Sequence, residues 1–267
     1  MTTRSEIESR FSTKRIDTAV KTLQSTKLGA VLVEFGLMKE VYIELDNSME
    51  TAGYFSENLM GAPTIKLNAN LNDYGLAIAL AHELCHVEQI MVAPYPFTFS
   101  NPLDAIKLTR IYEAVASTFS TGVAYELFQK TGDVGYLESL SDWEEGDIKD
   151  AFLVSASDSQ PIISDTSPFI AGFDQWFKRP QRVEHYDTAA IQAFTDFKDN
   201  TLLHVLFNKS VKPLTFDMLK DVGHLLAHTN YLKEINMKSP LLESSLYAGN
   251  ISISALHQAD ELFCSYG

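Results

Sequence analysis

The sequence predicts an α+β protein that is predominantly helical, with a small N-terminal sheet. Short runs of β-branched and aromatic residues, separated by glycine and proline, occur before residue 70. After residue 97 the apolar residues recur mainly at helical spacing. We expect a single domain over residues 1–267, with the sheet and one histidine-containing helix in residues 1–97 and a helical part in residues 98–267.

The N-terminal part is expected to begin with a helix and to continue with short strands. Residues 5–28 carry a loose apolar stripe at helical spacing, which predicts the helix. The apolar runs 30–35 and 41–45 favour strands, and Gly53–Phe55 and Thr64–Asn68 would add two more. These strands would form the small sheet.

The segment Leu76–Ile90 is rich in apolar residues around a polar motif, which predicts a helix buried beneath the floor of a site. Asn70 or Asn72, together with Asp73, offers an N-terminal cap and an acidic first turn. Two prolines end the helix soon after Gln89.

The helical part contains one long predicted helix and several shorter ones. The long helix runs from Leu103 to Lys130, opened by an Asn-Pro pair and closed near a glycine. A further helix is expected from about Trp143, and residues 159–183 are predicted as loop because prolines and a glycine interrupt them. Three more helices are predicted, over residues 186–198, 214–235 and 252–263.

The composition is that of an ordinary globular protein, and its charge excludes some partners. The formal net charge of −14 argues against nucleic acid, whose phosphates need a basic surface. We expect no membrane association and a cytoplasmic location, because the N-terminus lacks a signal-peptide core and no long apolar run occurs. The two cysteines, Cys85 and Cys264, form no disulfide framework, and the oligomeric state stays open.

The motif in the first buried helix is His-Glu-Leu-Cys-His, residues 82–86. Because His82 and His86 are four residues apart, both imidazoles leave one face of the helix and can bind one metal ion. Glu83 leaves the helix about 100° further round, close enough to touch a metal-bound water. The ligand types favour Zn²⁺, with other first-row ions possible, and Glu83 would take the water proton and pass it to a leaving group.

A catalytic zinc site usually has a third protein ligand, and Glu113 is the strongest candidate. It lies on the next predicted helix, among small apolar residues that allow close helix packing. A lone carboxylate there is costly to bury unless it is paired or metal-bound. Two alternatives stay open: Glu113 could face solvent and pair with Arg110, or Asp104 or Asp187 could be the ligand instead.

The order of these residues resembles the gluzincin branch of the zincin metallopeptidases. It is also similar to a bacterial family of metallopeptidase-like domains of uncharacterised role. In that family a His-Glu-Leu-x-His-x-x-Gln helix precedes a Glu-Ala-x-Ala helix, and a Trp-Phe…Tyr-Asp segment follows. This chain has the corresponding residues at 82–89, 113–116, 176–177 and 186–187.

The resemblance implies a zincin-like fold with one Zn²⁺ per chain. The ligands would be His82, His86 and Glu113, and Glu83 would be the general base. Thr64–Asn68 would be the edge strand that precedes the motif helix.

The resemblance also bears on two supporting roles. Thermolysin-like members carry an Asp four residues after the ligand Glu to orient a histidine; here that place is Ser117, so the support around the ligands differs. Zincins also use a donor for the oxyanion of the tetrahedral intermediate. Tyr186 is expected in that role, with His185 as the other candidate.

Together these features predict a zinc metallohydrolase, most simply a peptidase that acts on a peptide or protein held along Thr64–Asn68 by edge pairing. Two alternatives stay open: a non-catalytic zinc-containing binding or structural protein, with a fourth ligand such as Cys85, and a delivered effector or toxin protease. A buried apolar role is otherwise expected for Cys85. A second pair, His224 and His228, lacks an adjacent Glu and is expected to be structural, and the acidic run 142–147 is expected to be a solvated helix start.

Overall fold

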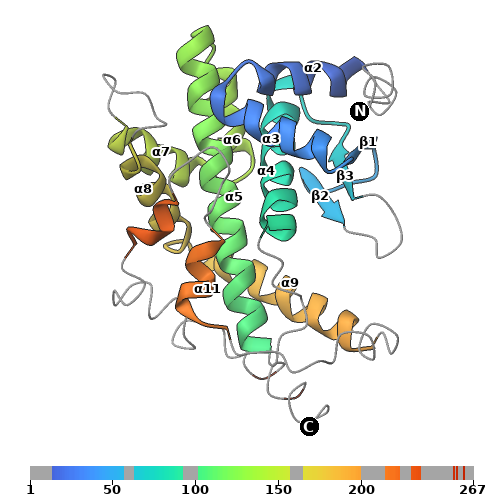
Figure 1. The fold of residues 1–267 in the computed structure, drawn as a ribbon, viewed down its shortest axis with the longest axis vertical. Coiled ribbons are helices and arrows are strands. Elements are labelled where there is room, and N and C mark those ends of the chain that lie inside the picture. Colours follow the sequence, from blue (N-terminus) through green and yellow to red (C-terminus); the bar gives the residue numbers. More distant parts are fainter. Residues whose placement is uncertain are drawn as a thin grey trace.

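The computed structural model describes most of the chain, namely residues 14–56, 63–92, 102–156, 165–199, 214–222 and 230–235, with residues 255, 257 and 261. Within these ranges the protein is predominantly helical and has one small sheet, which confirms the predicted fold class (Figure 1). None of the described helices combines the length and the apolarity needed to cross a membrane.

The elements are labelled in Figure 1. The strands are β1 (Tyr42–Asp46), β2 (Gly53–Ser56) and β3 (Thr64–Asn68). The helices are α2 (Lys14–Gln24), α3 (Lys27–Met38), α4 (Asp73–Val92), α5 (Pro102–Thr131), α6 (Gly135–Asp142), α7 (Gly146–Ser155), α8 (Ser167–Trp176), α9 (Pro180–Asp199) and α11 (Phe216–Asp221), with a short 3-10 helix, η2 (Tyr231–Lys233).

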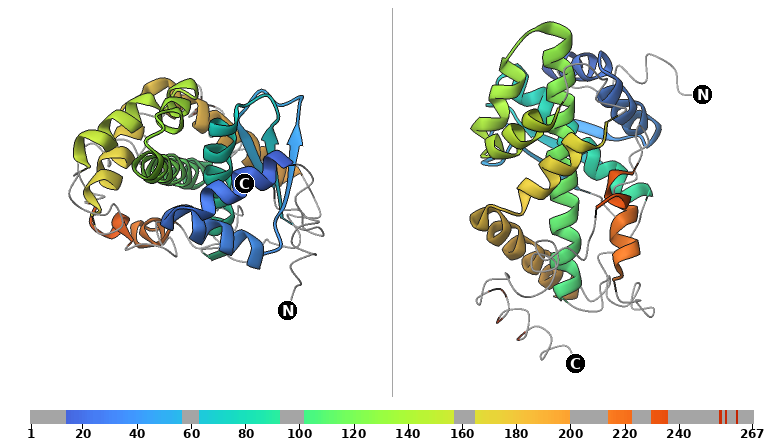
Figure 2. Two further views of the ribbon diagram at one scale, coloured as in Figure 1. Left: turned by 90° about the horizontal axis from the view of Figure 1, so that it is seen from above. Right: turned by 90° about the vertical axis from the view of Figure 1, so that its left-hand side faces the viewer.

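Helix α5 is the centre of the helical part. Seen from above it is surrounded by other helices, with the sheet to one side (Figure 2, left). Buried residues lie all round it and include many small ones such as Ala114, Ala116 and Gly122. A helix that is apolar on every face is stable only when it is enclosed, and small side chains let its neighbours approach closely.

The sheet is mixed, with strand order β1-β3-β2. β3 pairs in parallel with β1 and antiparallel with β2, so that Ile65 lies between Ile43 and Phe55. Residues Thr64–Asn68 therefore form the central strand, and the prediction of an edge strand there is wrong. β3 cannot pair with a peptide, because both of its edges are already bonded. Among the described strands, β2 instead offers a free edge.

Helix α4, which carries the motif, is anchored at its N-terminus. The Asn72 side chain accepts a hydrogen bond from the Gly75 N–H at 2.8 Å, so Asn72 is the cap and Asn70 is not. Arg15 of α2 bonds the Ala69 carbonyl oxygen at 2.7 Å, the Leu71 carbonyl oxygen and Asp73. These contacts hold the start of the helix against α2.

Replacing Asn72 with Ala should lower the free energy of unfolding by about 1 kcal/mol, because the cap bond is lost. Asn70→Ala is the matched control: the Asn70 side chain is exposed and reaches only the Asn47 carbonyl oxygen, at 3.3 Å. It should change stability by less than about 0.5 kcal/mol. Urea unfolding would measure both. Equal losses in the two variants would contradict the assignment of the cap.

Residues 30–35 lie in helix α3, so the strand predicted there is wrong. An apolar run of this length fits a buried helix as well as a buried strand. Two residues that lie outside the run stabilise the start of the helix. The Thr26 hydroxyl accepts a hydrogen bond from the Gly29 N–H at 3.1 Å, and Glu126 of α5 accepts one from the Leu28 N–H at 2.9 Å. These contacts satisfy N–H groups that a helix start leaves unpaired.

The helix predicted over residues 5–28 is divided. Its described part forms α2 and the first residues of α3, which are separated by a turn after Gln24. The residues before Lys14 lie outside the described ranges.

The helix expected from about Trp143 is present as α7, but it begins slightly later, because the residues just after Trp143 form a turn between two helices. Trp143 ends α6, and α7 begins at Gly146. Glu144 has a φ of 62°, a left-handed conformation that interrupts a helix. The turn directs Glu144 outward and Glu145 inward, since Glu144 is exposed and Glu145 is buried.

The loop predicted over residues 159–183 is wrong for its described part, which contains α8 and the start of α9. Pro168 lies in the first turn of α8, where its missing N–H costs nothing. Phe169, Phe173 and Trp176 are buried at helical spacing, a pattern that the prolines and the glycine obscure.

The helix expected at 186–198 is confirmed as part of the longer α9. The last two predicted helices are tested only in part. Of the predicted helix 214–235, the described residues form α11 and η2. His224, His228 and most of residues 252–263 lie outside the described ranges.

Candidate metal centre

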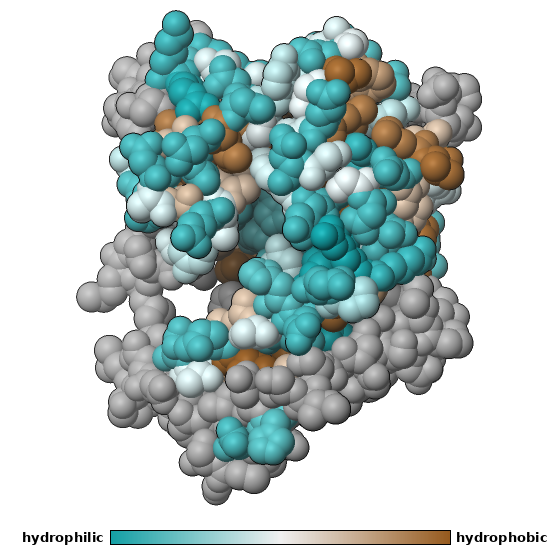
Figure 3. All heavy atoms as spheres, turned by 180° about the vertical axis from the view of Figure 1, so that it is seen from behind, coloured by the Kyte–Doolittle hydropathy of each residue, from teal (hydrophilic) through white to brown (hydrophobic). Residues whose placement is uncertain are grey.

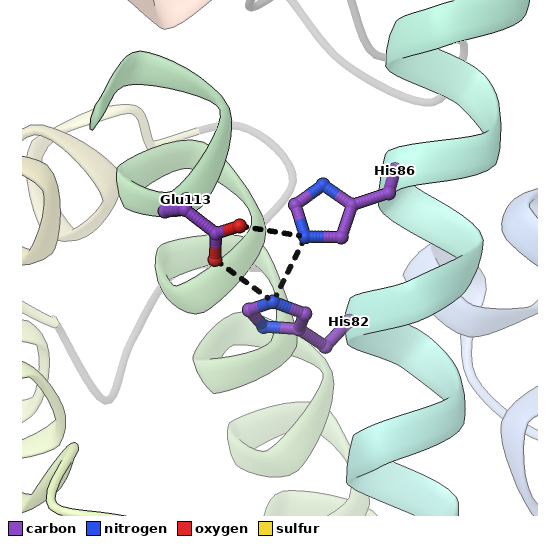
Figure 4. A group of neighbouring side chains, drawn as sticks. All are labelled: His82, His86 and Glu113. Atoms are coloured by element: carbon purple, nitrogen blue, oxygen red, sulfur yellow. Dashed lines mark hydrogen bonds and ion pairs between the residues drawn. The ribbon is translucent and has the colours of Figure 1, made fainter. Parts of the chain in front are cut away.

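Three side chains from two helices converge at one point (Figure 4). His82 and His86 of α4 and Glu113 of α5 turn their ligand atoms toward one another, and they are the one group of described residues arranged to hold a metal ion. The two Nε2 atoms are 3.1 Å apart. The Glu113 oxygens lie 3.4 Å from His82 Nε2 and 3.5 Å from His86 Nε2.

These separations fit a tetrahedral ion. Zinc binds histidine nitrogen and carboxylate oxygen at about 2.0–2.2 Å, so two ligand atoms around a tetrahedral zinc lie about 3.3 Å apart. The two Nε2 atoms are 3.1 Å apart, and His82 and His86 lie 3.4 and 3.5 Å from different oxygens of Glu113. With one ligand atom taken from each residue, the three atoms lie within 4.8 Å of one another, which is compact enough to surround one ion.

Gln89 orients one of the two histidines. Its Oε1 lies 2.8 Å from His86 Nδ1, and its Nε2 donates to the Tyr112 carbonyl oxygen at 3.0 Å. Because Gln89 presents an acceptor, Nδ1 of His86 carries the proton and Nε2 keeps its lone pair for a metal. Tyr112 precedes Glu113, so the same amide also ties α4 to the part of α5 that carries the third ligand.

The electrostatics of the cluster favour a cation. Burial acts to lower the pKa of His82, but its hydrogen bond to Glu113 and the charges of Glu83, Glu113 and Glu145 raise it to about 9. Burial likewise opposes ionisation of Glu113, yet His86 and His82 hold its pKa well below the ordinary value. The carboxylates thus draw positive charge to this point, and a divalent ion would supply it.

A cavity of about 730 Å³ opens beside the ligand atoms. Its floor is formed by α4 and α5, and its walls by β2 with the residues before it, by the α6–α7 turn and by α9. Figure 3 shows a hollow near the centre of the face opposite to that in Figure 1, with hydrophilic side chains over most of its rim. A metal ion held here would keep an open side.

Glu83 is held beside this cavity by strand β2. A Cβ atom at Gly53 would lie 2.6 Å from Glu83 Oε1, so a larger residue at position 53 would displace the carboxylate. Burial raises the pKa of Glu83, against the charges of His82 and His86 and a hydrogen bond from the Phe55 backbone N–H. A raised pKa suits a group that takes up and releases a proton.

Tyr186 of α9 also lines the cavity, next to Glu113. Its pKa is raised well above the ordinary value, chiefly by the charge of Glu113 and by burial, and its hydroxyl donates a hydrogen bond to Glu113. The Trp176 ring packs against it, with centroids 5.5 Å apart. His185 is exposed and also lines the cavity. Both candidates for the oxyanion donor therefore face the site.

Residues 6–232 match the family model described as "Putative metallopeptidase family (DUF6782)". The chain belongs to this family. Membership in a metallopeptidase family implies a metal cofactor and a peptide or protein substrate, and the cluster in Figure 4 is a candidate site for that metal. No curated protein and no solved structure matches the chain.

The other carboxylates considered as ligands are not part of this candidate cluster. Asp187 forms a two-point ion pair with Arg110, with both contacts at 2.6 Å and both side chains fully buried. Arg110 is thus engaged by Asp187 and does not pair with Glu113 as one alternative supposed. Asp104 is bonded by Lys107 and by the Leu214 N–H.

The sequence did not indicate that Glu145 belongs to the site. The acidic run 142–147 was expected to be a solvated helix start, but Glu145 is 9% exposed and lines the cavity. Its carboxylate lies beside Ser117, the residue one turn after Glu113. No local pattern separates Glu145 from the exposed Glu144, because the turn between α6 and α7 decides which of them is buried.

Proposed function

We propose that this member of the family is a zinc-dependent peptidase of the gluzincin type, with His82, His86 and Glu113 as ligands. One observation carries the proposal: two imidazoles and a carboxylate, with ligand atoms within 4.8 Å of one another, line a cavity that Glu83 and Tyr186 also line. A non-catalytic scaffold would close the ion with a fourth ligand. Cys85, the candidate for that role, is fully buried in the core and is not part of the ligand cluster of described residues.

The roles of the protein groups follow from their positions. A bound zinc ion would polarise the scissile carbonyl and lower the pKa of its water to about 7. Glu83 would take the proton from that water and hand it to the departing amine, since its carboxylate is held between Gly53 and the ligand histidines. Tyr186 would exchange its bond to Glu113 for one to the developing oxyanion.

Strand β2 is the proposed seat for the substrate backbone. Residues from Glu50 to Phe55 line the cavity, and β2 pairs only with β3 among the described strands. An extended peptide could add to its free edge through main-chain hydrogen bonds. The Tyr54 side chain, 58% exposed on this strand, would lie beside such a peptide.

The proposal is tested by the metal content of the purified chain after reconstitution with zinc and dialysis. We expect one zinc ion per wild-type chain, and none in His82→Ala or Glu113→Ala. The matched control is Asp104→Ala, a buried carboxylate on α5 that lies outside the cluster and should leave the zinc in place.

Cleavage is followed on a peptide library by mass spectrometry. New termini are expected with the zinc-loaded wild-type chain and not after chelation. A wild-type chain that binds no zinc, or a Glu113→Ala chain that keeps it, would overturn the proposed site. A zinc-loaded chain that cleaves no member of a broad library would overturn the peptidase assignment.

A further inference from the structure

The two proposed histidine ligands are supported unequally. Nδ1 of His86 bonds Gln89, which fixes the tautomer and the ring orientation. Nδ1 of His82 makes no hydrogen bond within the described part of the chain, although its Nε2 is aimed at His86 and Glu113. Metal-bound histidines almost always donate this second N–H to an acceptor. His82 therefore lacks the partner that its role demands.

A buried acceptor without a partner lines the same cavity. Glu145 is 9% exposed, and its Oε2 is fully buried and makes no hydrogen bond among the described residues. Such an orphaned carboxylate is costly to hold in a protein interior. A polar neighbour, Ser117 of α5, is itself 1% exposed, and among the described residues its hydroxyl makes no hydrogen bond of ordinary geometry.

The turn that carries Glu145 is fixed from outside. Arg182 of α9 donates to the Glu144 carbonyl oxygen at 2.6 Å and to the Trp176 carbonyl oxygen at 3.2 Å, and it forms an ion pair with Asp147 at the start of α7. Arg179 adds a bond to the same Glu144 carbonyl oxygen at 2.8 Å. These contacts hold the turn over the cavity, so the burial of Glu145 is imposed by the fold.

The charge of Glu145 acts on His82. His82 is the foremost group that stabilises the ionised Glu145, ahead of Ser117 and Arg182, while burial raises the pKa of Glu145 overall. A neutral His82 with a proton on Nδ1 would give Glu145 a donor and leave Nε2 free for a metal. His82 and Glu145 line the same cavity, and among the described residues neither His82 Nδ1 nor Glu145 Oε2 has a hydrogen-bond partner.

We propose that Glu145 is a positioning residue for His82, accepting the Nδ1 proton directly or through one water when the metal is bound. The inference rests on the metal site proposed above. In this proposal Glu145, on the α6–α7 turn, orients the histidine ligand. Ser117 of α5, which stands at the position of the orienting Asp in thermolysin-like members, has a shorter side chain without a carboxylate. Because Glu145 lies on the α6–α7 turn and His82 on α4, metal binding would link the turn to α4.

The test is zinc affinity measured by competition with a chromogenic chelator at neutral pH. Glu145→Gln keeps the shape and removes the charge, and we expect its zinc affinity to fall about 10- to 100-fold. Asp142→Asn is the matched control, because Asp142 is an exposed carboxylate that lines the same cavity. It should bind zinc within about threefold of the wild type, since exposed charges are screened.

Two further readouts separate positioning from a structural role. The visible spectrum of the cobalt-loaded Glu145→Gln chain should differ from the wild-type spectrum, because His82 is free to rotate. The metal-free variant should resist urea at least as well as the wild type, since a neutral side chain is cheaper to bury. A purely structural Glu145 would instead lower stability and leave the zinc affinity and the cobalt spectrum unchanged.

Each outcome decides one of the proposals. If the wild type binds zinc and Glu145→Gln binds it with the same affinity, this inference is overturned and the proposed function still stands. If zinc affinity falls equally in Glu145→Gln and Asp142→Asn, the effect of Glu145 is a general effect of negative charge, and the inference is also overturned. A wild-type chain that binds no zinc would overturn both.

Discussion

Glu83→Gln is expected to keep one zinc ion per chain and to lower kcat/KM by about 10² to 10⁴-fold, the range that general acid–base catalysis contributes. Gln fills the same space beside Gly53 and can still accept a bond from the Phe55 N–H, but it cannot take up a proton. The proposed ligands His82, His86 and Glu113 are untouched. The loss should therefore fall on kcat and not on metal content.

Glu34→Gln is the control for this result. Glu34 is exposed on α3 and is not among the residues that line the cavity, so its replacement removes an equal charge without touching the proposed general base or the proposed substrate seat. Its kcat/KM should stay within about threefold of the wild type, because a solvent-exposed charge is screened. Both are measured on a substrate that the zinc-loaded wild type cleaves. A Glu83→Gln chain with its zinc and full activity would contradict the mechanism.

Asp187→Asn is expected to lower the free energy of unfolding by about 3–5 kcal/mol, because it removes one partner of a buried ion pair. Arg110 and Asp187 are both fully buried and make two contacts of 2.6 Å between α5 and α9. Arg110 lies one turn before Glu113, and Asp187 follows Tyr186. The pair thus joins α5, which carries the proposed third ligand Glu113, to α9, which carries the proposed oxyanion donor Tyr186.

Two further variants make the Asp187 prediction specific, and urea unfolding of the metal-free chains measures all of them. Asp17→Asn removes the carboxylate of an exposed pair with Lys21 on α2 and should cost less than about 1 kcal/mol. The double change Arg110→Met with Asp187→Leu should recover much of the loss, because no charge is left buried. A loss in Asp187→Asn no larger than that in Asp17→Asn would contradict the structural role of the pair.

Local spacing determined the part of the site that lies within one helix. The interval between His82 and His86 places both imidazoles on one face of any α-helix, whatever surrounds it, and the structure brings Glu113 to them as expected. Capping and proline signals likewise located α4 and α5 to within a few residues. The identity of the metal and the catalytic roles remain predictions.

Tertiary contacts decided what no local pattern could. The run at residues 30–35 became part of α3 because Thr26 and Glu126 cap its start. β3 is the central strand because β1 and β2 pair with its two edges, which leaves β1 and β2 as the outer strands of the described sheet.

The same holds for the carboxylates around the metal centre. Asp187 forms an ion pair with Arg110, and Glu145 is buried because Arg182 fixes the turn that carries it. A charged residue has the same sequence signature whether it faces solvent, an ion pair or a metal. Its surroundings, supplied by residues far away in the chain, set the cost of burying it and therefore its role.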